Sequence, residues 1–295
     1  MRADKLLTLA AGGLQLEISP SIGGAISSFL WVDGERSRPI LRECHSPLEK
    51  AVNAANFPLV PYVNRIRGGR FRFRGREVRI APNMAGDPSP LHGQGWINPW
   101  AVDEASERTA RLSFHHEAGE WPWIYDALQS FALDEDRLTI TLTCRNLSDD
   151  AMPCGLGQHP YFPCGPATRL DTVVTDVWTI DDHVLPVEKV RAEGRYDLRK
   201  RLVCGQDLDH GFGGWGGLAW TGDPDWPYEL HLSSPDAEFF QLYSPPAGGI
   251  FVAEPVTHAN AALNAPENEW PELGMRVLDP GEAMGLTMRL DVLQT

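Results

Sequence analysis

Hydrophobic and polar residues alternate with a period of two in several stretches of the chain. Between positions 138 and 144, four apolar residues alternate with three threonines. The same alternation covers 286–292 and recurs on both sides of Gly75 within 70–80. A period of two is typical of β-strands that bury one face. These segments therefore predict strands, and 70–80 predicts a hairpin that turns at Gly75.

The N-terminal segment admits two interpretations. Its apolar stretch from Leu6 to Leu14 follows Arg2 and Lys5, as in the hydrophobic region of a signal peptide. However, a Gly-Gly pair at 12–13 interrupts this stretch, and the residues from Leu14 onward alternate between apolar and polar. We therefore predict that the segment forms the first β-hairpin of the fold.

Helical patterns are scarce, and the best covers roughly residues 187–202, where Gly194 interrupts it. The chain contains 28 Gly and 24 Pro, which provide many turns, and neither a repeat nor a Ser- or Gly-rich linker divides it. Many short strands separated by such turns are typical of a sandwich or a barrel. We predict an all-β protein in which residues 1–295 form one large antiparallel domain.

Composition and charge exclude several classes of protein. The 295 residues include 26 Lys and Arg against 40 Asp and Glu, a formal charge of −14. This balance argues against nucleic-acid binding, which requires a basic surface, and no stretch has the length of a membrane helix. The five cysteines contain no C-x-x-C pair and indicate neither a disulfide framework nor a zinc site. We expect a cytoplasmic protein that binds neither nucleic acid nor membranes.

Candidate functional residues lie where polar side chains occur among Gly, Pro and aromatic residues, because loops in β proteins make such side chains available to a ligand. The segments are Asn64–Ile66, Leu91–Gly93, Gly157–Phe162, Ala253–Pro255 and, more weakly, Leu208–Phe212.

Each candidate also has a purely structural interpretation. His92 and His159, taken singly, are more often hydrogen-bonded structural residues than ligands. Glu254 follows an apolar run and could face either solvent or a pocket. Asp209 could form a turn, and Arg65 could be a solvated cation.

Other features indicate little chemistry. The arginines at 70, 72 and 74 share one strand face and are best interpreted as a stripe that faces water. Aromatic faces pack well on sugar rings, but a Trp is more often part of the core, so both roles stay open for Trp121, Trp123 and Trp215. The chain has no G-x-S-x-G elbow, P-loop or G-x-G-x-x-G motif. The 115–117 segment lacks the H-E-x-x-H spacing of a zinc protease, and we expect no metal site.

Taken together, the candidate segments resemble the aldose 1-epimerase (galactose mutarotase) family. They occur in the family's order over about residues 56–264, with the run GLGQHPYF ending at Phe162 and Gln241-Leu242-Tyr243 before Glu254. The resemblance implies a large antiparallel β-sandwich, a galactose mutarotase-like supersandwich, with a sugar cleft on its concave face. It also implies interconversion of the α and β anomers of a free aldose without a cofactor.

The resemblance assigns the reacting groups to two residues. Glu254 matches the general base that removes the proton from the C1 hydroxyl, and His159 matches the general acid that protonates the ring oxygen. The ring then opens to the aldehyde, rotation about C1–C2 exposes the other carbonyl face, and the same groups act in reverse. The base must be ionised while the acid is protonated, so their environments should differ. A nearby carboxylate would favour the charged histidine.

The expected binding residues and the alternatives follow from the same matches. His92 and Arg65, with Asn64 beside Arg65, are expected to bind the sugar near its ring, and Asp209 to hold outer hydroxyls. Gln-His-Pro replaces the Asn-His-Thr of many sugar mutarotases, and the sequence at 257–260 also differs from that of the better-known galactose enzymes, so the sugar is left open.

Two other functions remain alternatives to the mutarotase interpretation. One is a hexose-6-phosphate 1-epimerase, for which Arg65, Arg67 and Arg70 would supply the cations. The other is a non-catalytic sugar-binding module on the same fold. We expect a monosaccharide as the partner, and a monomer or a homodimer.

Overall fold

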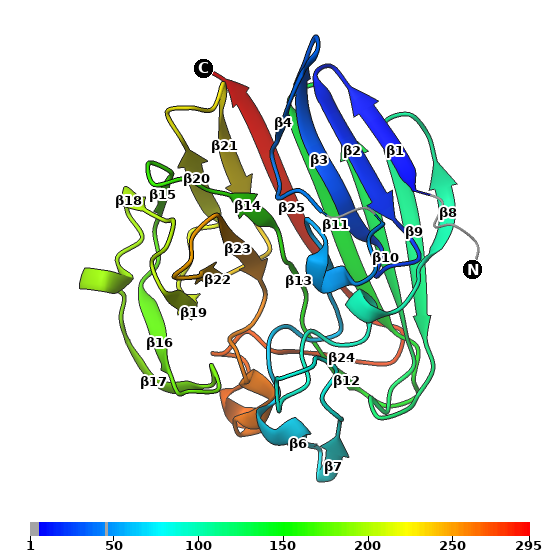
Figure 1. Ribbon diagram of the computed structural model, residues 1–295. Helices are drawn as coiled ribbons and strands as arrows, with labels where there is room; N and C mark the ends of the chain where they lie inside the picture. Colours follow the sequence, from blue (N-terminus) through cyan, green and yellow to red (C-terminus); the bar gives the residue numbers. More distant parts are fainter. Residues whose placement is uncertain (1–5, 45–46) are drawn as a thin grey trace.

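The computed structural model describes residues 6–44 and 47–295, in which antiparallel strands dominate (Figure 1). The larger sheet has nine strands in the order β18-β15-β20-β21-β25-β11-β10-β9-β8. In chain order these are β8 (Ala101–Ala105), β9 (Thr109–His116), β10 (Tyr125–Leu133), β11 (Arg137–Asn146), β15 (Arg169–Thr172), β18 (Arg201–Leu202), β20 (Leu218–Gly222), β21 (Tyr228–Ser233) and β25 (Ala283–Gln294).

The second large sheet has eight strands and carries most of the candidate site residues. Its order is β17-β16-β19-β22-β23-β13-β5, and β14 pairs with β23 outside this path. Its strands are β5 (Pro58–Leu59), β13 (Gly157–Gln158), β14 (Tyr161–Pro163), β16 (Asp176–Ile180), β17 (Pro186–Arg191), β19 (Leu208–Gly213), β22 (Phe239–Ser244) and β23 (Ile250–Val256).

Three smaller sheets contain the remaining strands. The N-terminal sheet is blue in Figure 1 and contacts the nine-stranded sheet through β1, which packs against β9 and β10. It contains β1 (Leu7–Ala11), β2 (Leu14–Ser19), β3 (Ala25–Asp33) and β4 (Arg36–Pro39). The two-stranded sheets pair β6 (Arg70–Phe73) with β7 (Arg76–Arg79) and β12 (Met152–Cys154) with β24 (Arg276–Leu278).

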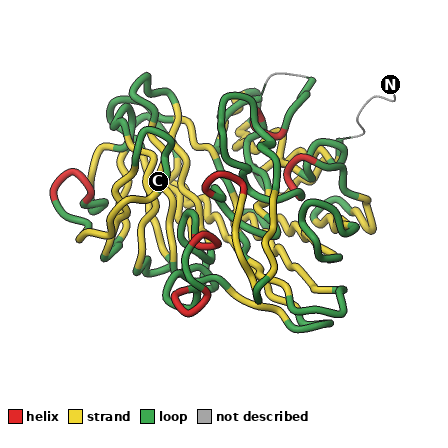
Figure 2. Tube along the Cα trace, turned by 90° about the horizontal axis from the view of Figure 1, so that it is seen from below, coloured by secondary structure: helices red, strands yellow, loops and turns green. Residues whose placement is uncertain are grey.

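Helical structure is confined to single 3-10 turns within the described residues, and these lie in the loops between strands (Figure 2). None of these turns has the length or the apolar composition of a membrane-spanning helix. The turns are η1 (Ala51–Asn53), η2 (Arg67–Gly69), η3 (Gly95–Ile97), η4 (Gly194–Tyr196), η5 (Ala262–Asn264) and η6 (Glu267–Glu269).

The alternating segments form the strands that the sequence predicts. In β11 the four apolar residues of the alternation are fully buried, and the neighbouring β25 buries its own apolar residues in register with them. The hairpins β1–β2 and β6–β7 are also confirmed. Gly12 and Gly75 lie in their turns with positive φ values of 54° and 80°, a region that glycine enters without steric cost. The prediction of an all-β protein is therefore confirmed.

The segment 187–202 is not a helix. Its first part belongs to β17, which pairs with β16, and the rest contains η4 and the short strand β18. Gly194 has a φ of 60°, which interrupts any continuous helix at this point. Pairing with β16 and β15 supplies the backbone hydrogen bonds that a helix would otherwise make internally. Sheet partners that are distant in sequence therefore outweigh the weak local pattern.

Candidate active site

A cavity of about 270 Å³ opens on the eight-stranded sheet, and all six predicted site residues line it. Three strands of this sheet, β19, β22 and β23, provide the floor, and loops from the first hundred residues provide the walls. The lining residues are Val52, Phe57, Asn64, Arg65, Met84, Leu91, His92, Trp96, His159, Tyr161, Asp209, Gln241, Tyr243 and Glu254.

The strand register determines which side chains meet on the floor. Glu254 on β23 lies opposite Gln241 on β22, and Tyr243 on β22 lies opposite Asp209 on β19. Gln241 and Tyr243 are two residues apart, so both side chains project from the same face of the sheet. The Gln241 Nε2 donates a hydrogen bond of 2.9 Å to the Asp209 Oδ1. An amide and two carboxyl groups thus form a row across three neighbouring strands.

Two loop segments hold each other in the wall above this row. The Asn64 N–H donates to the His92 Nδ1 at 3.0 Å, and the His92 N–H donates to the Asn64 carbonyl, also at 3.0 Å. Both residues have positive φ values, 56° and 58°, in the left-handed region where Asn and His are enriched. Because the Nδ1 accepts a hydrogen bond, the ring proton of neutral His92 lies on Nε2.

Arg65 supplies the positive charge among the side chains that line the cavity. Its Nε lies 2.8 Å from the Asp87 Oδ2, and its Nη1 donates to the Asn64 Oδ1 at 3.2 Å. The side chains of this ion pair are only 11% and 9% exposed. The Arg65 N–H donates to the Asn260 Oδ1, so the loop around Asn260 also fixes this segment. The charge of Arg65 is therefore already balanced by a carboxylate.

His159 and Glu254 meet at the other end of the row. The His159 Nε2 lies 3.4 Å from the Glu254 Oε1, and both side chains are buried. The imidazole stacks on Phe57 with ring centroids 4.4 Å apart, and the backbone N–H of His159 donates to the Phe57 carbonyl. The buried Nδ1 of His159 has no hydrogen-bond partner within the described part of the chain.

Burial shifts the pKa values of this pair in opposite directions. It raises the pKa of Glu254 well above its ordinary value, an effect that Asp209 reinforces and Arg65 opposes. It lowers the pKa of His159 to about 3, and the nearby Arg42 adds to this effect. The loss of solvation thus exceeds the effect of the carboxylate, which by itself would favour a charged histidine. Both shifts favour the uncharged forms of the two groups, a protonated Glu254 and a neutral His159.

The same balance of burial and charge shifts the pKa values of the other titratable groups in the cavity. Burial lowers the pKa of His92 well below its ordinary value, and His159 and Arg65 lower it further. His92 is therefore neutral and presents its Nε2–H as a donor. Burial raises the pKa of Asp209, while Arg65 and the hydrogen bond from Gln241 oppose that rise.

Gln158 does not line the cavity, and it instead joins the two large sheets beneath His159. The Asn56 Nδ2 donates to the Gln158 Oε1 at 2.7 Å, and the Gln158 Nε2 donates to the Gln129 Oε1 at 3.1 Å. Gln129, on β10 of the nine-stranded sheet, donates in turn to the Gly24 carbonyl. All three amide side chains are buried. Buried amides that are joined in this way fix the separation of the sheets.

The remaining histidine and tryptophan candidates also lie away from the cavity. His258 accepts from the Val63 N–H through Nε2, and His210 accepts from the N–H of Asp209 through Nδ1. The tryptophans considered as sugar platforms are buried in the core, namely Trp121, Trp123 and Trp215.

Sequence reasoning missed several lining residues. Tyr161, Gln241 and Tyr243 occur within segments that already stood out, and their strand positions next to the predicted pair could have identified them. Val52, on η1, had no such signal, and Trp96 lies on η3 just after the candidate segment Leu91–Gly93.

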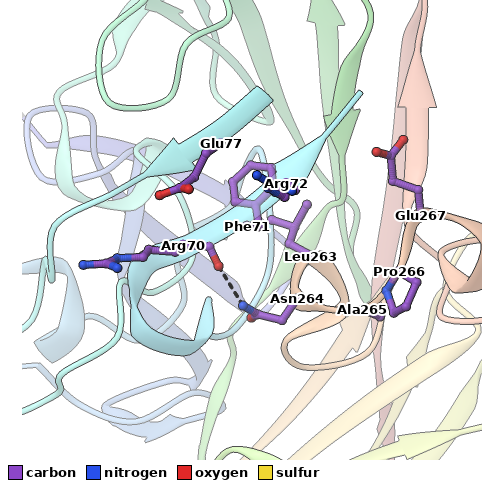
Figure 3. A pocket seen from close by; sticks show the side chains of 9 residues that line it. All are labelled: Arg70, Phe71, Arg72, Glu77, Leu263, Asn264, Ala265, Pro266 and Glu267. Atoms are coloured by element: carbon purple, nitrogen blue, oxygen red, sulfur yellow. Dashed lines mark hydrogen bonds between the residues drawn. The ribbon is translucent and has the colours of Figure 1, made fainter. Parts of the chain in front are cut away.

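The arginine stripe lies elsewhere. Arg70 and Arg72 line a separate pocket of about 500 Å³ between the β6–β7 hairpin and residues 263–267 in and after η5 (Figure 3). Asn264 holds the two segments together by donating to the Arg70 carbonyl at 2.8 Å. The side chains of the stripe are exposed, as the interpretation of a face in contact with water requires.

Comparisons with known proteins show similarity over nearly the whole chain. The Escherichia coli K12 protein YphB, which is uncharacterised, is 33% identical over 301 aligned residues, covering 97% of this chain and 98% of YphB. A crystal structure of a provisionally assigned aldose 1-epimerase from Escherichia coli K12 has a TM-score of 0.89 and 32% identity, with 99% of each chain covered. A galactose mutarotase-like protein from Clostridium acetobutylicum shares the fold, with a TM-score of 0.86 at 19% identity over 99% of this chain and 96% of its own.

A protein-family model also matches the chain. The model described as aldose 1-epimerase matches residues 5–291, nearly the whole chain. The resemblance carried by the polar segments is thereby confirmed, as is the galactose mutarotase-like fold. The chain belongs to the aldose 1-epimerase family.

Proposed function

We propose that the protein is an aldose 1-epimerase that interconverts the α and β anomers of a free monosaccharide by general acid–base catalysis without a cofactor. The observation that supports this most directly is the buried contact of 3.4 Å between the His159 Nε2 and the Glu254 Oε1 on the floor of the cavity. The cavity volume of about 270 Å³ lies just below the range of roughly 300–1,000 Å³ typical of drug-sized ligands, which suits one sugar ring.

The proton that the raised pKa keeps on Glu254 can start the proton transfers that ring opening requires. Moving that proton from Glu254 to His159 gives a carboxylate and an imidazolium without exchange with solvent. The carboxylate then takes the proton from O1 as the imidazolium protonates O5, the C1–O5 bond breaks, and the C1–O1 bond becomes a carbonyl. Closure onto the other carbonyl face returns both protons. Each positioned acid or base contributes about 10²–10⁴ to the rate.

The surrounding groups bind and orient the sugar in this proposal. Neutral His92 offers a donor near the acid–base pair, and charge that develops on oxygen during ring opening would accept its hydrogen bond. Arg65 and Asn64 bind near the ring, while Asp209, held by Gln241, accepts hydrogen bonds from outer hydroxyls.

The charges around the cavity do not favour a phosphorylated substrate. Arg65 is paired with Asp87. The Arg67 guanidinium lies 3.4 Å from Asp181 and donates to the Pro186 carbonyl. Arg70 lines the separate pocket of Figure 3. A phosphate at the cavity would therefore have to displace existing partners, whereas a neutral sugar would not.

Polarimetry tests the proposal. Freshly dissolved α-anomers of glucose, galactose, xylose and arabinose are followed with the wild-type protein and with Glu254→Gln. Acceleration by the wild type alone supports catalysis through Glu254, and the ranking of the sugars names the substrate. Saturable sugar binding without acceleration would indicate the binding module instead. Acceleration confined to glucose 6-phosphate would favour the phosphorylated alternative.

A further inference from the structure

A series of ring contacts connects the cavity with the loop after β4. Phe57 stacks on His159 with ring centroids 4.4 Å apart, and the tilted ring of Tyr161 lies 4.8 Å from the His159 centroid. The Arg42 guanidinium carbon lies 3.4 Å from the Tyr161 ring centroid. A guanidinium over an aromatic face gains cation–π attraction, which holds both groups in place.

Arg42 also joins two segments that are distant in the fold. Its N–H donates to the Tyr161 carbonyl at 2.8 Å, which fixes the loop to β14. Its side chain donates to the Ala54 carbonyl at 2.8 Å through Nε and to the Val52 carbonyl through Nη2. Val52 and Tyr161 both line the cavity, on η1 and on β14. One side chain therefore connects two parts of the cavity wall.

The charge of Arg42 has no carboxylate partner in the described ranges, since its donors meet backbone carbonyls and an aromatic ring. No carboxylate among these partners neutralises its positive charge beside Tyr161 and His159. The titratable or charged groups that face His159 are Glu254 on β23, His92 in the loop before η3, Tyr161 on β14 and, behind Tyr161, Arg42.

We propose that Arg42 is a positioning residue, which clamps η1 to Tyr161 and places a positive charge against Tyr161, the ring next to His159. The clamp part rests on the proposed function, because it concerns sugar binding. The charge opposes a second proton on the His159–Glu254 pair, since a doubly protonated pair would carry a net positive charge close to another cation. The charge of Arg42 thus adds to burial in disfavouring a second proton on the pair.

Coulomb's law gives the size of this effect. The two centroid distances place the charge at most about 8 Å from the imidazole. At that separation, effective dielectric constants between about 80 and 20 correspond to a shift of roughly 0.4–1.5 pH units. The Arg42→Gln variant should therefore protonate His159 at a higher pH than wild type by this amount.

The test is a pH titration of ¹³C-labelled histidine by NMR, which needs no turnover. We compare wild type, Arg42→Gln, Arg42→Lys and, as a control, Arg72→Gln on the exposed face of β6. At the lowest pH values at which all four remain folded, only Arg42→Gln should show a larger protonated fraction of His159 than wild type. Equal fractions in wild type and Arg42→Gln would overturn the electrostatic part, whatever the protein catalyses.

The Arg42→Lys variant tests the clamp, and it also keeps the proposal testable if Arg42→Gln does not fold. Lysine keeps the charge but lacks the planar fork that reaches two carbonyls while it stacks. We expect an unshifted His159 titration and a KM raised several-fold with a smaller change in kcat. An unchanged KM would overturn the clamp. A shifted titration in Arg42→Gln without any mutarotation in wild type would refute the proposed function and leave the electrostatic inference standing.

Discussion

Replacing Glu254 with glutamine should remove activity and at the same time stabilise the fold. Glutamine has nearly the same shape but cannot act as a base, so the sugar loses the group proposed to deprotonate O1. We expect the mutarotation rate to fall by about 10²–10⁴. In the fold, burial and Asp209 keep the pKa of Glu254 well above its ordinary value, so ionising this carboxyl costs stability.

The sign of the pH dependence follows from proton linkage. The folded state holds the Glu254 proton to a higher pH than the unfolded state, in which a Glu titrates near about 4.3. Above that pH the folded protein binds more protons, so wild-type stability falls as pH rises toward the folded-state pKa. The slope is at most about 1.4 kcal/mol per pH unit. Glu254→Gln lacks this contribution, and its advantage over wild type should grow with pH.

Urea denaturation at several pH values between 5 and 8 measures the change in stability, and polarimetry measures the loss of activity. Glu104→Gln is the control, because Glu104 lies on the exposed edge strand β8. Its stability relative to wild type should show little dependence on pH. A difference between Glu254→Gln and wild type that stays flat or shrinks with rising pH would refute the electrostatic reasoning. A folded Glu254→Gln protein with full activity would refute the catalytic assignment.

Three further predictions concern the surrounding residues. His92→Phe removes both the Nε2–H donor and the acceptor of the Asn64 N–H, so kcat/KM should fall by about 10²–10³ in polarimetry, and unchanged kinetics would exclude this role. Gln129→Leu leaves the Gln158 amide without its acceptor, so the free energy of unfolding measured in urea should fall by about 1–3 kcal/mol. A variant as stable as wild type would contradict a stabilising role for the buried amides. Burial lowers the pKa of His258 to about 4, so the unfolded state binds more protons below about pH 6.5, and wild type should lose stability as pH falls. His258→Gln should lose less over that interval, and parallel stability curves would be the contrary result.

The sequence predicted residues that the fold brings together, but it did not predict their environment. Asn64, Arg65, His92, His159, Asp209 and Glu254 all line one cavity, as the resemblance implied. The sequence also suggested that a neighbouring carboxylate would favour a charged histidine. That prediction could not include the burial of both groups, because burial depends on which strands and loops close around them.

Elements that are stabilised by distant partners were harder to predict. Gly194 and the charged residues around it gave a weak helical pattern, yet pairing with β16 and β15 makes strands of the two ends of the segment. Trp96 lines the cavity while Trp121 and Trp123 pack in the core, although all three are tryptophans among polar and glycine residues. Local sequence contains no information that separates these cases.

The sequence by itself determined the strand character of the chain and the chemical types available to the site, because side-chain alternation and functional groups are local properties. Tertiary structure alone decided that Glu254 contacts His159 in a buried site, that Asp87 pairs with Arg65, and that Arg42 lies against the Tyr161 ring. These facts depend on register, burial and loop packing between segments far apart in the chain. The electrostatics of the site follow from distances that exist only in the folded protein.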